Sequence, residues 1–483
     1  MKRYNNAILD GVLEEFEGLA AIPRPSGHEK AVSDYLKQRL ETLGFSVVQD
    51  DVYNIIADKP ATKGYEKSPR TILQGHMDMV CVAQPGYAYT PEQDPIRLVY
   101  GEQYLEAKGT SLGADDGIGV AAAIYLMQTV KEHGPLRFIV TVDEERGMTG
   151  TMALSEKYFA DANFLINCDS ENYDELTIGS AGGVDIEFTR ELSRTAPAQK
   201  NCYRITVNGL RGGHSGERIG DGRGNAIRTL ALALFSIQDH GILELISLSG
   251  GTARNAIPSA SEAVIRTNLS EEDLRAIIDE QKMRFLHSYG NVDPNVRMEV
   301  QTINVDPNPI KAGDTMRLLR LLVMLHTGVF SMSSVASGVE TSANLGRVDM
   351  NGERVAVQFY PRSEIDEKTE EFCLFAKQLA ALTGFSANIG VPSPAWKANP
   401  NSRLAHLMAG IFKKQNGKSM KIETIHAGLE CSWHARKNPE LDMVSVGVTT
   451  ENIHSPQERL VLATIEPQVK MIAEAIKRIA QMV

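Results

Sequence analysis

Three short apolar runs constrain the fold of this chain more than any other feature of its sequence. They span Thr71–Val80, Leu136–Asp143 and Ala162–Cys168, and each is almost continuously apolar. Such runs are typical of strands that are covered on both faces, as in parallel sheets flanked by helices. The long, Ala-rich segment Gly117–Lys131 predicts one of the covering helices. We therefore expect an α/β domain with a helix-covered, mostly parallel sheet.

The middle of the chain has a different pattern, in which helices and strands follow one another in two sets of similar order. The first set is predicted as strand Cys202–Val207, helix Asn225–Gln238, strands Ile242–Leu248 and Glu262–Asn268, helix Glu271–Tyr289 and strand Arg297–Ile303. The second is helix Thr315–His326, a hairpin over Gly346–Tyr360 that turns at Asn351-Gly352, helix Glu367–Leu382 and strand Ser386–Gly390. The two sets suggest a duplicated, ferredoxin-like α+β insert.

The first pattern resumes after Pro394, with a helix over Ser402–Asn416, a strand over Met443–Val448 and a helix over Glu466–Met482. The chain has 483 residues, about three times the usual length of one domain, so more than one core is expected. We predict one domain built from residues 1–184 and 393–483, interrupted by an inserted domain of residues 185–392.

Charge and cysteine content narrow the classes of function. Fifty Lys and Arg against 61 Asp and Glu give 50 − 61 = −11, which disfavours nucleic acid and anionic membranes as partners. The five cysteines are scattered and form no CxxC pair, which argues against a disulfide framework or a zinc ribbon. No signal peptide and no apolar run of eighteen residues are evident. We therefore expect a cytoplasmic protein.

Acidic or imidazole side chains follow each of the three predicted strands. They belong to the segments Gly75-His76-Met77-Asp78, Asp143-Glu144-Glu145 and Asn167-Cys168-Asp169. Because ligands bind at the carboxyl ends of the strands in an open parallel sheet, we expect these side chains to converge. His76 and Asp78 lie two residues apart, on one strand face, and an Asp beside a ligating His fixes its tautomer.

Two further segments add candidate metal ligands. Asp115 and Asp116 lie in a Gly-flanked turn before the predicted helix, and His454 lies just beyond strand Met443–Val448. A carboxylate in such a turn has two oxygens and can bridge two cations. Two His with several Asp and Glu, and no Cys, form a set of ligands suited to two zinc ions, with cobalt or manganese as substitutes.

Together these segments resemble a known family. The runs HMDMV, SLGADDGIG, DEERGMTGT, NCDSE, GGHSG, RNAIP and ENIHSP occur in this order over nearly the whole chain. They look like the di-zinc metallopeptidase family of aminoacylases, glutamate carboxypeptidases and dipeptidases. LQGHMDMVC, SLGADDGIGVA, the long insert and HAGLEC most resemble the bacterial aminoacyl-histidine (carnosine-cleaving) dipeptidases. The resemblance implies a zinc-exopeptidase fold with a lid or dimerisation insert, and a homodimer.

The resemblance also implies roles for individual residues. Asp115 would bridge both zinc ions, and its peptide bond with Asp116 would be cis. The other metal ligands would be His76 and Asp169 on one ion, and Glu145 and His454 on the other. Asp78 would orient His76, and Glu144 would be the general base that activates a water between the two ions. The sequence departs from the family pattern at three positions. Asp116 stands where close relatives often have Asn, and Arg146 is available to pair with Asp143. His434 has no family role and is expected at the surface.

Candidate substrate contacts lie mainly in the insert. His214 is a candidate donor to the oxyanion, and in relatives the corresponding His often reaches the partner subunit's active site. Asn255 resembles a substrate-contacting Asn, or is a turn residue before Pro258. Arg362 is a candidate clamp for a peptide's free carboxylate, because a guanidinium binds both oxygens at once. His426 and Glu430 either line the pocket for the C-terminal residue or, for Glu430, have a structural role.

These features predict a cytosolic di-zinc dipeptidase that acts on short peptides with a free C-terminus, most of all Xaa-His. A broader di- or tripeptidase, or an N-acyl amino acid hydrolase, would use the same metal chemistry. An inactive peptide-binding protein is the alternative outside enzymes, although the general base and all five proposed ligands are present. A two-metal enzyme acting on nucleic acid is disfavoured by the net charge of −11.

Overall fold

The computed structural model describes residues 4–304 and 307–482, and the chain divides into two compact units. The first comprises Met1–Gly179, Ala398–Glu423 and Leu429–Val483; the second comprises Ser180–Lys397 and Thr424–Gly428. The predicted junctions, at 184/185 and 392/393, lie five residues from the limits at 179/180 and 397/398. Residues Thr424–Gly428, predicted in the first domain, belong instead to the second unit. The roles of the two units, catalytic and lid or dimerisation, stay predictions.

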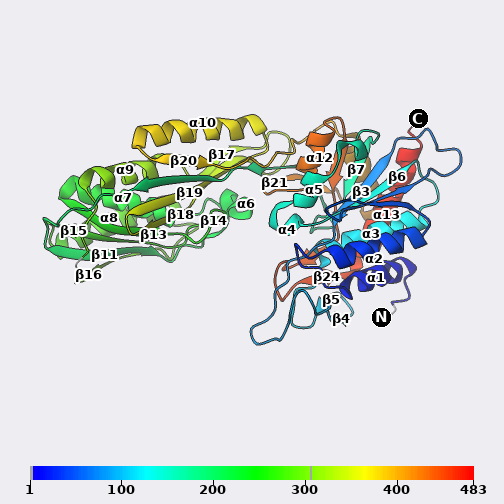
Figure 1. The fold of residues 1–483 in the computed structure, drawn as a ribbon, viewed down its shortest axis with the longest axis horizontal. Helices are drawn as coiled ribbons and strands as arrows, with labels where there is room; N and C mark the ends of the chain where they lie inside the picture. The colour runs from blue at the N-terminus through cyan, green and yellow to red at the C-terminus, as the bar shows by residue number, and fades with distance from the viewer. Residues whose placement is uncertain (1–3, 305–306, 483) are drawn as a thin grey trace. The chain divides into compact units, whose positions relative to one another are not determined.

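The first unit contains an eight-stranded sheet (Figure 1). Three pairs at its centre are parallel, and the pairs β1–β2, β2–β6 and β22–β8 are antiparallel. The predicted mostly parallel sheet is confirmed at the centre, where the strands are almost entirely buried. In spatial order the strands are β1 (Ser46–Gln49), β2 (Ile55–Lys59), β6 (Leu136–Thr141), β3 (Thr71–His76), β7 (Phe164–Asn167), β22 (Asp442–Ser445), β8 (Glu175–Ser180) and β21 (Lys421–Ile425).

Helices cover this sheet, as predicted. They are α1 (Ala7–Ala20), α2 (Lys30–Thr42), α3 (Ala114–Thr129), α11 (Arg403–Asn416) and α13 (Ile465–Ala480). Helix α3 packs on β3 and β6 and against α1, and it is buried nearly all round, as expected of a helix between a sheet and another helix. No helix within the described ranges has the length and apolar character needed to cross a bilayer.

Strand β3 is shorter than the predicted run Thr71–Val80. Its last residue is His76, and the Met77 amide still donates to the Thr141 carbonyl at 2.8 Å. The Met79 amide instead donates to the Arg24 carbonyl, so the chain leaves the sheet at this point. The apolar run thus continues past the strand because it stays buried against another segment.

The second unit contains a ten-stranded sheet in which every assigned pair is antiparallel. One βαββαβ copy comprises β11 (Asn201–Asn208), α7 (Ala226–His240), β13 (Leu243–Gly250), β15 (Ser261–Thr267), α8 (Glu271–Tyr289) and β16 (Arg297–Thr302). The other comprises β10 (Ile186–Glu191), α9 (Ala312–Met324), β18 (Val339–Asn351), β19 (Arg354–Ser363), α10 (Asp366–Thr383) and β20 (Ser386–Ile389). This confirms the predicted ferredoxin-like duplication.

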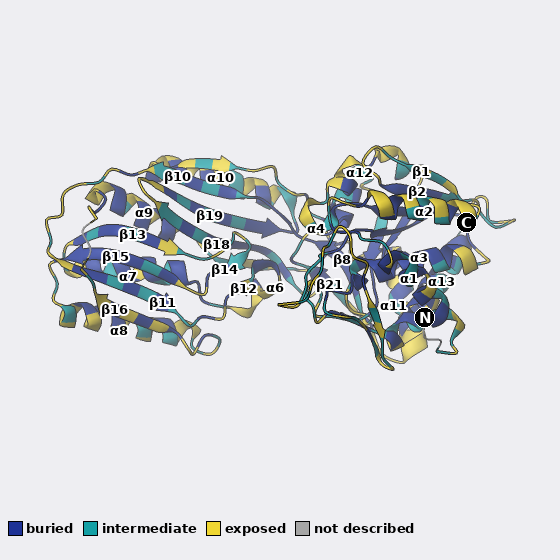
Figure 2. Cartoon of the chain, turned by 60° about the horizontal axis from the view of Figure 1, so that its bottom comes forward, coloured by how far each residue is buried: buried dark blue, intermediate teal, exposed yellow. Residues whose placement is uncertain are grey.

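The two copies are nested rather than consecutive. The predicted second set had no first strand, and the structure supplies it as β10, which precedes the whole first copy in the chain and pairs with β19 and β20. The spatial order β16-β11-β15-β13-β18-β19-β10-β20 places the copies side by side. Helices α8, α7, α9 and α10 pack in a row on one face and form a single apolar core with the sheet (Figure 2).

Candidate active site

His76 ends β3 at the centre of the first unit's sheet, and its side chain is buried. Because β6 and β7 run parallel to β3 on either side, the segments that follow all three strands emerge at the same edge. Glu144 and Glu145 follow β6, and Asp169 follows β7. The predicted convergence of these side chains therefore follows from the strand order.

The first group of candidate ligands surrounds the Nε2 atom of His76. This atom lies 3.1 Å from Oδ1 of Asp115 and 3.4 Å from Oδ1 of Asp169. One donor atom from each of the three residues lies within 4.8 Å of the others. The predicted ligands of one cation are therefore neighbours in space, although Asp115 enters from the start of α3 and not from a strand.

The second group surrounds the Nε2 atom of His454. This atom lies 3.0 Å from Oδ2 of Asp115 and 2.9 Å from Oε1 of Glu145. Asp115 thus faces His76 with one carboxylate oxygen and His454 with the other. A carboxylate with its two oxygens directed at separate sets of ligands is the arrangement that bridging two cations requires.

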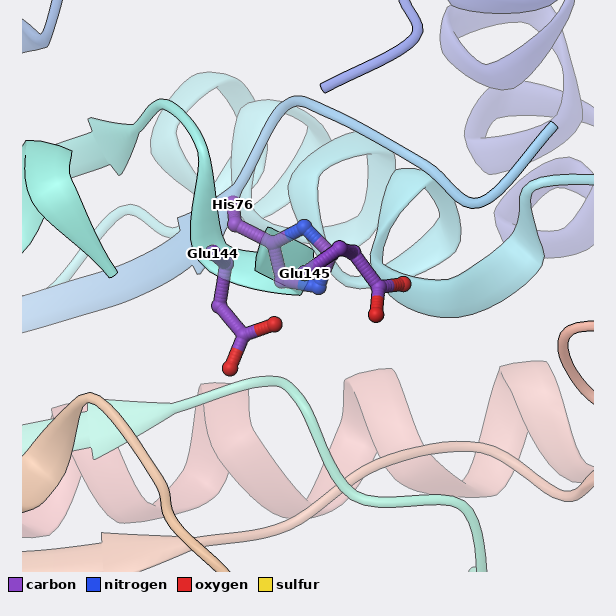
Figure 3. A group of neighbouring side chains, drawn as sticks. All are labelled: His76, Glu144 and Glu145. Carbon is purple, nitrogen blue, oxygen red and sulfur yellow. The ribbon is translucent and has the colours of Figure 1, made fainter. Parts of the chain in front are cut away.

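Glu144 and Glu145 are consecutive, yet their carboxylates point in different directions from the segment that follows β6 (Figure 3). Both still have an oxygen within 4.8 Å of a ring nitrogen of His76 and of each other. Glu145 also reaches His454, whereas no hydrogen bond joins the Glu144 carboxylate to a described residue. The Glu144 carboxylate is therefore close to the candidate ligands without being hydrogen-bonded to any of them.

Asp78 connects His76 to the two glutamates. Its Oδ1 lies 3.4 Å from Nδ1 of His76, on the side of the ring away from Asp115, and Asp78 is completely buried. The backbone amides of Glu144 and Glu145 donate to its two carboxylate oxygens at 3.1 and 3.3 Å. Asp78 thus contacts the imidazole and accepts hydrogen bonds from the backbone of both glutamates.

Asp116 lies behind His76. The peptide bond between Asp115 and Asp116 is cis, in agreement with the resemblance. The Asp116 carboxylate accepts a hydrogen bond from the His76 amide at 3.2 Å. A Cβ atom at Gly75 or Gly119 would lie 2.1 Å from an Asp116 oxygen, so both positions require glycine. The Asp116 carboxyl is therefore buried and bonded to the backbone of a candidate ligand, and burial together with the charges of Asp169 and Asp115 raises its pKa.

The cluster contains more negative than positive charge. Burial raises the pKa of Asp169, and burial together with Asp169 and Glu145 raises the pKa of Glu144. Burial opposes the charged form of His76, but Asp169, Asp115 and Asp78 outweigh it and raise the pKa of this imidazole. Hydrogen bonds to Asp115 and Glu145 raise the pKa of His454 to about 11. Buried carboxylates held this close together are stabilised by cations.

The available donor atoms fit zinc. Two imidazole nitrogens and the carboxylates of Asp115, Glu145 and Asp169 form two sets of ligands that share Asp115, and no thiol takes part. This mixture of nitrogen and oxygen ligands is typical of zinc sites and also accepts cobalt or manganese.

The second unit brings Arg362 and His426 onto one face of β18 and β19. Ser342 on β18 pairs in register with Arg362, and its hydroxyl lies 2.6 Å from Nε2 of His426. Arg362 is buried and its guanidinium lies 4.6 Å from the centre of the Tyr360 ring. Its Nε atom has no hydrogen-bond partner among the described residues, and neighbouring Asp185 pairs with Arg254 instead. Arg362 is therefore a buried cation without a bonded carboxylate.

His214 and Asn255 lie close together in the second unit, at a short antiparallel ribbon of β12 (Gly213–His214) and β14 (Ala256–Ile257). His214 ends β12, and Asn255 immediately precedes β14. The Ser215 amide donates to the Asn255 carbonyl at 2.8 Å. Burial and the charge of Arg362 lower the pKa of His214, and the same two causes lower the pKa of His426 to about 3. Both imidazoles are therefore neutral near pH 7, and both are near Arg362.

A model of peptidase family M20/M25/M40 matches residues 72–478, which include every candidate ligand. The chain belongs to peptidase family M20/M25/M40. It is therefore a peptide-bond hydrolase of a metal-dependent family. The fold and the two candidate cation positions described above accord with this membership.

Several known proteins are similar over almost the whole chain. The cytosol non-specific dipeptidase of Escherichia coli is 34% identical, over 96% of each chain. The crystal structure of aminoacylhistidine dipeptidase from Vibrio alginolyticus superposes with a TM-score of 0.90 at 30% identity and covers 99% of each chain. A tripeptidase structure from Staphylococcus aureus, at 18% identity and a TM-score of 0.59, shares the fold.

Two sequence-predicted positions of this M20 peptidase are buried in the first unit. Glu430 is completely buried, and one of its carboxylate oxygens accepts a hydrogen bond of 2.5 Å from the side-chain amide of Gln74 on β3. The expectation of His434 at the surface is wrong: its ring is buried, stacks 4.9 Å from Phe159, and has Nδ1 3.3 Å from the Thr151 hydroxyl. Helix α12 (Cys431–Lys437) turns His434 inward, which an isolated Ser-Trp-His segment does not reveal.

Two buried charged residues beside the cation positions were missed in the sequence. Glu458 accepts hydrogen bonds from the backbone that leads into Asp115, and Arg24 donates to the carbonyls of Met77, Asp78 and Gly113. In the sequence alone, Glu458 stands beside Arg459 and resembles half of an ion pair at the surface. The one available signal was its spacing of four residues from His454.

Proposed function

We propose that this M20 peptidase is a cytoplasmic di-zinc dipeptidase that hydrolyses short peptides with a free C-terminus, with a preference for Xaa-His. The observation that carries the proposal is the position of Asp115 between His76 and His454, at 3.1 and 3.0 Å. His76, Asp115 and Asp169 would hold one zinc ion, and Asp115, Glu145 and His454 the other. The name of the E. coli relative and the five free thiols support the cytoplasm.

Glu144 is the proposed general base. When bound, the two zinc ions would act as Lewis acids that polarise the substrate carbonyl and make a neighbouring water more acidic. Glu144 would accept the proton of the attacking water and return it to the leaving amine. Burial raises the pKa of this carboxyl, which suits a group that must hold a proton between the two steps. Asp78 would keep both the base and His76 in place through its three contacts.

Arg362 is the proposed clamp for the substrate's free carboxylate. It is a buried guanidinium whose Nε has no hydrogen-bond partner among the described residues, and such a group gains most from a bidentate anion. His426, Asn255 and His214 are proposed to take part in binding, with His214 as the donor to the developing oxyanion. The neutral state of His214 leaves one ring nitrogen as a donor and the other as an acceptor.

The relatives support a dipeptidase but differ in the specificity that their names state. The V. alginolyticus protein is an aminoacylhistidine dipeptidase, and the E. coli protein is a non-specific dipeptidase. The HAGLEC segment and the insert favour the Xaa-His preference, while the E. coli relative favours broad dipeptide cleavage as the second candidate. Both candidates use the same metal chemistry and differ only in the pocket.

A substrate panel tests this proposal. Zinc-loaded protein is assayed with β-Ala-His, Ala-His, Ala-Leu, a tripeptide and an N-acetyl amino acid, with and without chelator. Chelator-sensitive cleavage of the Xaa-His pairs alone supports the preferred specificity, and equal cleavage of Ala-Leu supports the broader one. If metal-replete protein cleaves none of them, the dipeptidase proposal is wrong.

A homodimer is also proposed, through the second unit. The support is the family resemblance of the Gly-Gly-His-Ser-Gly segment around His214, whose counterpart in relatives serves the partner subunit. Light scattering on the intact chain should give twice the mass of one chain across a range of concentrations. A constant mass of one chain would rule the dimer out without affecting the metal chemistry.

A further inference from the structure

Glu458 lies four residues after His454, and only 3% of its surface is exposed. Both of its carboxylate oxygens accept hydrogen bonds from backbone amides of a distant segment. Oε2 accepts from the amides of Leu112 and Gly113 at 2.8 and 3.1 Å. Oε1 accepts from Ala114 at 2.8 Å and lies 3.5 Å from the amide of Asp115. One buried carboxylate thus binds the backbone of the residues that lead into Asp115.

Within residues 4–304 and 307–482, no other side chain accepts a hydrogen bond from these amides. Gly113 precedes α3 with φ 70°, a left-handed conformation, and no side chain of its own caps the helix. The backbone at Asp115 and Asp116 is not helical, so the amides of residues 112–115 precede the regular turns of α3. A buried amide without an acceptor is costly. Glu458 supplies that acceptor from the segment that contains His454.

Arg24 binds the backbone of the same segment, residues 112–115, and also that of the segment after β3. Its guanidinium is buried and donates to the Gly113 carbonyl at 2.5 Å and to the carbonyls of Met77 and Asp78 at 2.9 and 3.2 Å. Asp115 is therefore attached on one side to the end of β3, beside His76, and on the other side to the His454 segment.

We propose that Glu458 is a positioning residue for the candidate cation site formed by Asp115, Glu145 and His454. By bonding the backbone before Asp115 to its own segment, it keeps the Asp115 carboxylate and the His454 imidazole at bonding distance to the same cation. This inference rests on the proposed function, in which these residues hold zinc. Residues that hold metal ligands in place usually contribute about ten- to a hundredfold to metal affinity.

The chemistry requires a carboxylate and not merely a polar side chain. Glu458→Gln keeps the length of the side chain but replaces one acceptor oxygen by an NH2 group that faces backbone amides. At least one amide then loses its acceptor, and two donors face each other. Glu458→Asp keeps both oxygens but shortens the reach by one methylene. Glu106→Gln is the matched control. Glu106 is exposed on strand β5 (Tyr104–Ala107), which pairs with the segment that directly follows Glu458.

The experiment measures zinc affinity by competition with a chromophoric chelator, and amide hydrogen exchange of residues 112–115 in the metal-free protein. Glu458→Gln should lose about tenfold or more in affinity for one of two zinc ions, and its exchange at 112–114 should accelerate. Glu458→Asp should fall between it and wild type, and Glu106→Gln should match wild type. Circular dichroism identifies any variant that fails to fold. If Glu458→Gln does not fold, Glu458→Asp is compared with wild type instead.

The outcomes separate this inference from the proposed function. Wild-type protein that binds no zinc would overturn the proposed function itself. Wild-type zinc binding and peptide cleavage, with unchanged zinc affinity in a folded Glu458→Gln or Glu458→Asp variant, would overturn only the positioning role. Equal loss in the Glu106→Gln control would also overturn it, because the effect would then reflect surface charge.

Discussion

The Nδ1 atom of His76 lies 3.4 Å from Oδ1 of Asp78, and both side chains are buried. The opposite nitrogen of the ring faces Asp115 and Asp169. The backbone carbonyl of Asp78 lies closer to Nδ1, at 3.2 Å. Both acceptors favour the tautomer with a proton on Nδ1, which leaves the Nε2 lone pair facing the candidate cation position.

Asp78→Asn should therefore lower zinc affinity by about ten- to a hundredfold. The amide lacks the negative charge that stabilises the Nδ1–H tautomer, and it offers an NH2 group to the backbone amides of Glu144 and Glu145. Competition titration with a chelator measures the change, with exposed Asp51→Asn as the control. An affinity equal to that of wild type would show that the Asp78 carboxylate has no role in orienting His76, and would leave that role to the Asp78 backbone carbonyl.

Glu144→Gln should remove most turnover while zinc content stays at the wild-type level. General acid–base catalysis contributes about a hundred- to ten-thousandfold, so a loss of at least a hundredfold in kcat is expected. Zinc content by atomic spectroscopy and turnover of the preferred dipeptide are measured together. His454→Ala should lose zinc as well as activity. A fully active Glu144→Gln variant would exclude Glu144 as the base.

Arg362→Ala should raise KM for dipeptides with a free carboxylate and have little effect on C-amidated peptides. A planar guanidinium that binds both carboxylate oxygens is not replaced by an ammonium, so Arg362→Lys should recover only part of the loss. Arg354→Ala is the control, because Arg354 is exposed on the same strand β19. If the ratio of free to amidated substrate use is unchanged, Arg362 does not bind the carboxylate.

His434 should make the first unit less stable in acid. Burial lowers its pKa from the ordinary 6.5 to about 3, so the unfolded chain binds a proton at a higher pH than the folded one. The stability that it contributes is complete above pH 6.5 and is lost as the pH falls toward 3. At pH 5 the loss is about 2 kcal/mol.

The test compares urea unfolding of the zinc-free protein at pH 7 and pH 5. His434→Leu should lose less stability between the two pH values than wild type, while His406→Leu, at an exposed helical position, should behave as wild type. An identical loss in wild type and His434→Leu would mean that His434 takes up its proton in the folded state.

The sequence predicted most of the secondary structure because its elements are amphipathic or buried in regular patterns. Helix α8 begins and ends at the predicted residues, Glu271 and Tyr289, between a Ser270 cap and Gly290. The predicted β18–β19 hairpin forms, but its two-residue turn is Gly352-Glu353, one residue later than predicted, because Asn351 still pairs with Arg354. Gly352 has φ 61°. Strand β10 was missed. Its apolar and polar residues alternate only over the first few positions of Ile186–Glu191, and it is far in sequence from the other elements of its βαββαβ copy.

The amino-acid sequence by itself determined the α/β class, the duplicated insert and the proximity of His76, Asp169 and the Glu pair, because strand order in a parallel sheet brings strand ends together. The resemblance of the sequence had already implied that Asp115 bridges two ions. Only the tertiary structure decided that His434 is buried and that Glu458 binds the backbone before Asp115. Those features depend on side-chain direction and on contacts between segments 283 and 346 residues apart, and such contacts leave no periodic signal in the sequence.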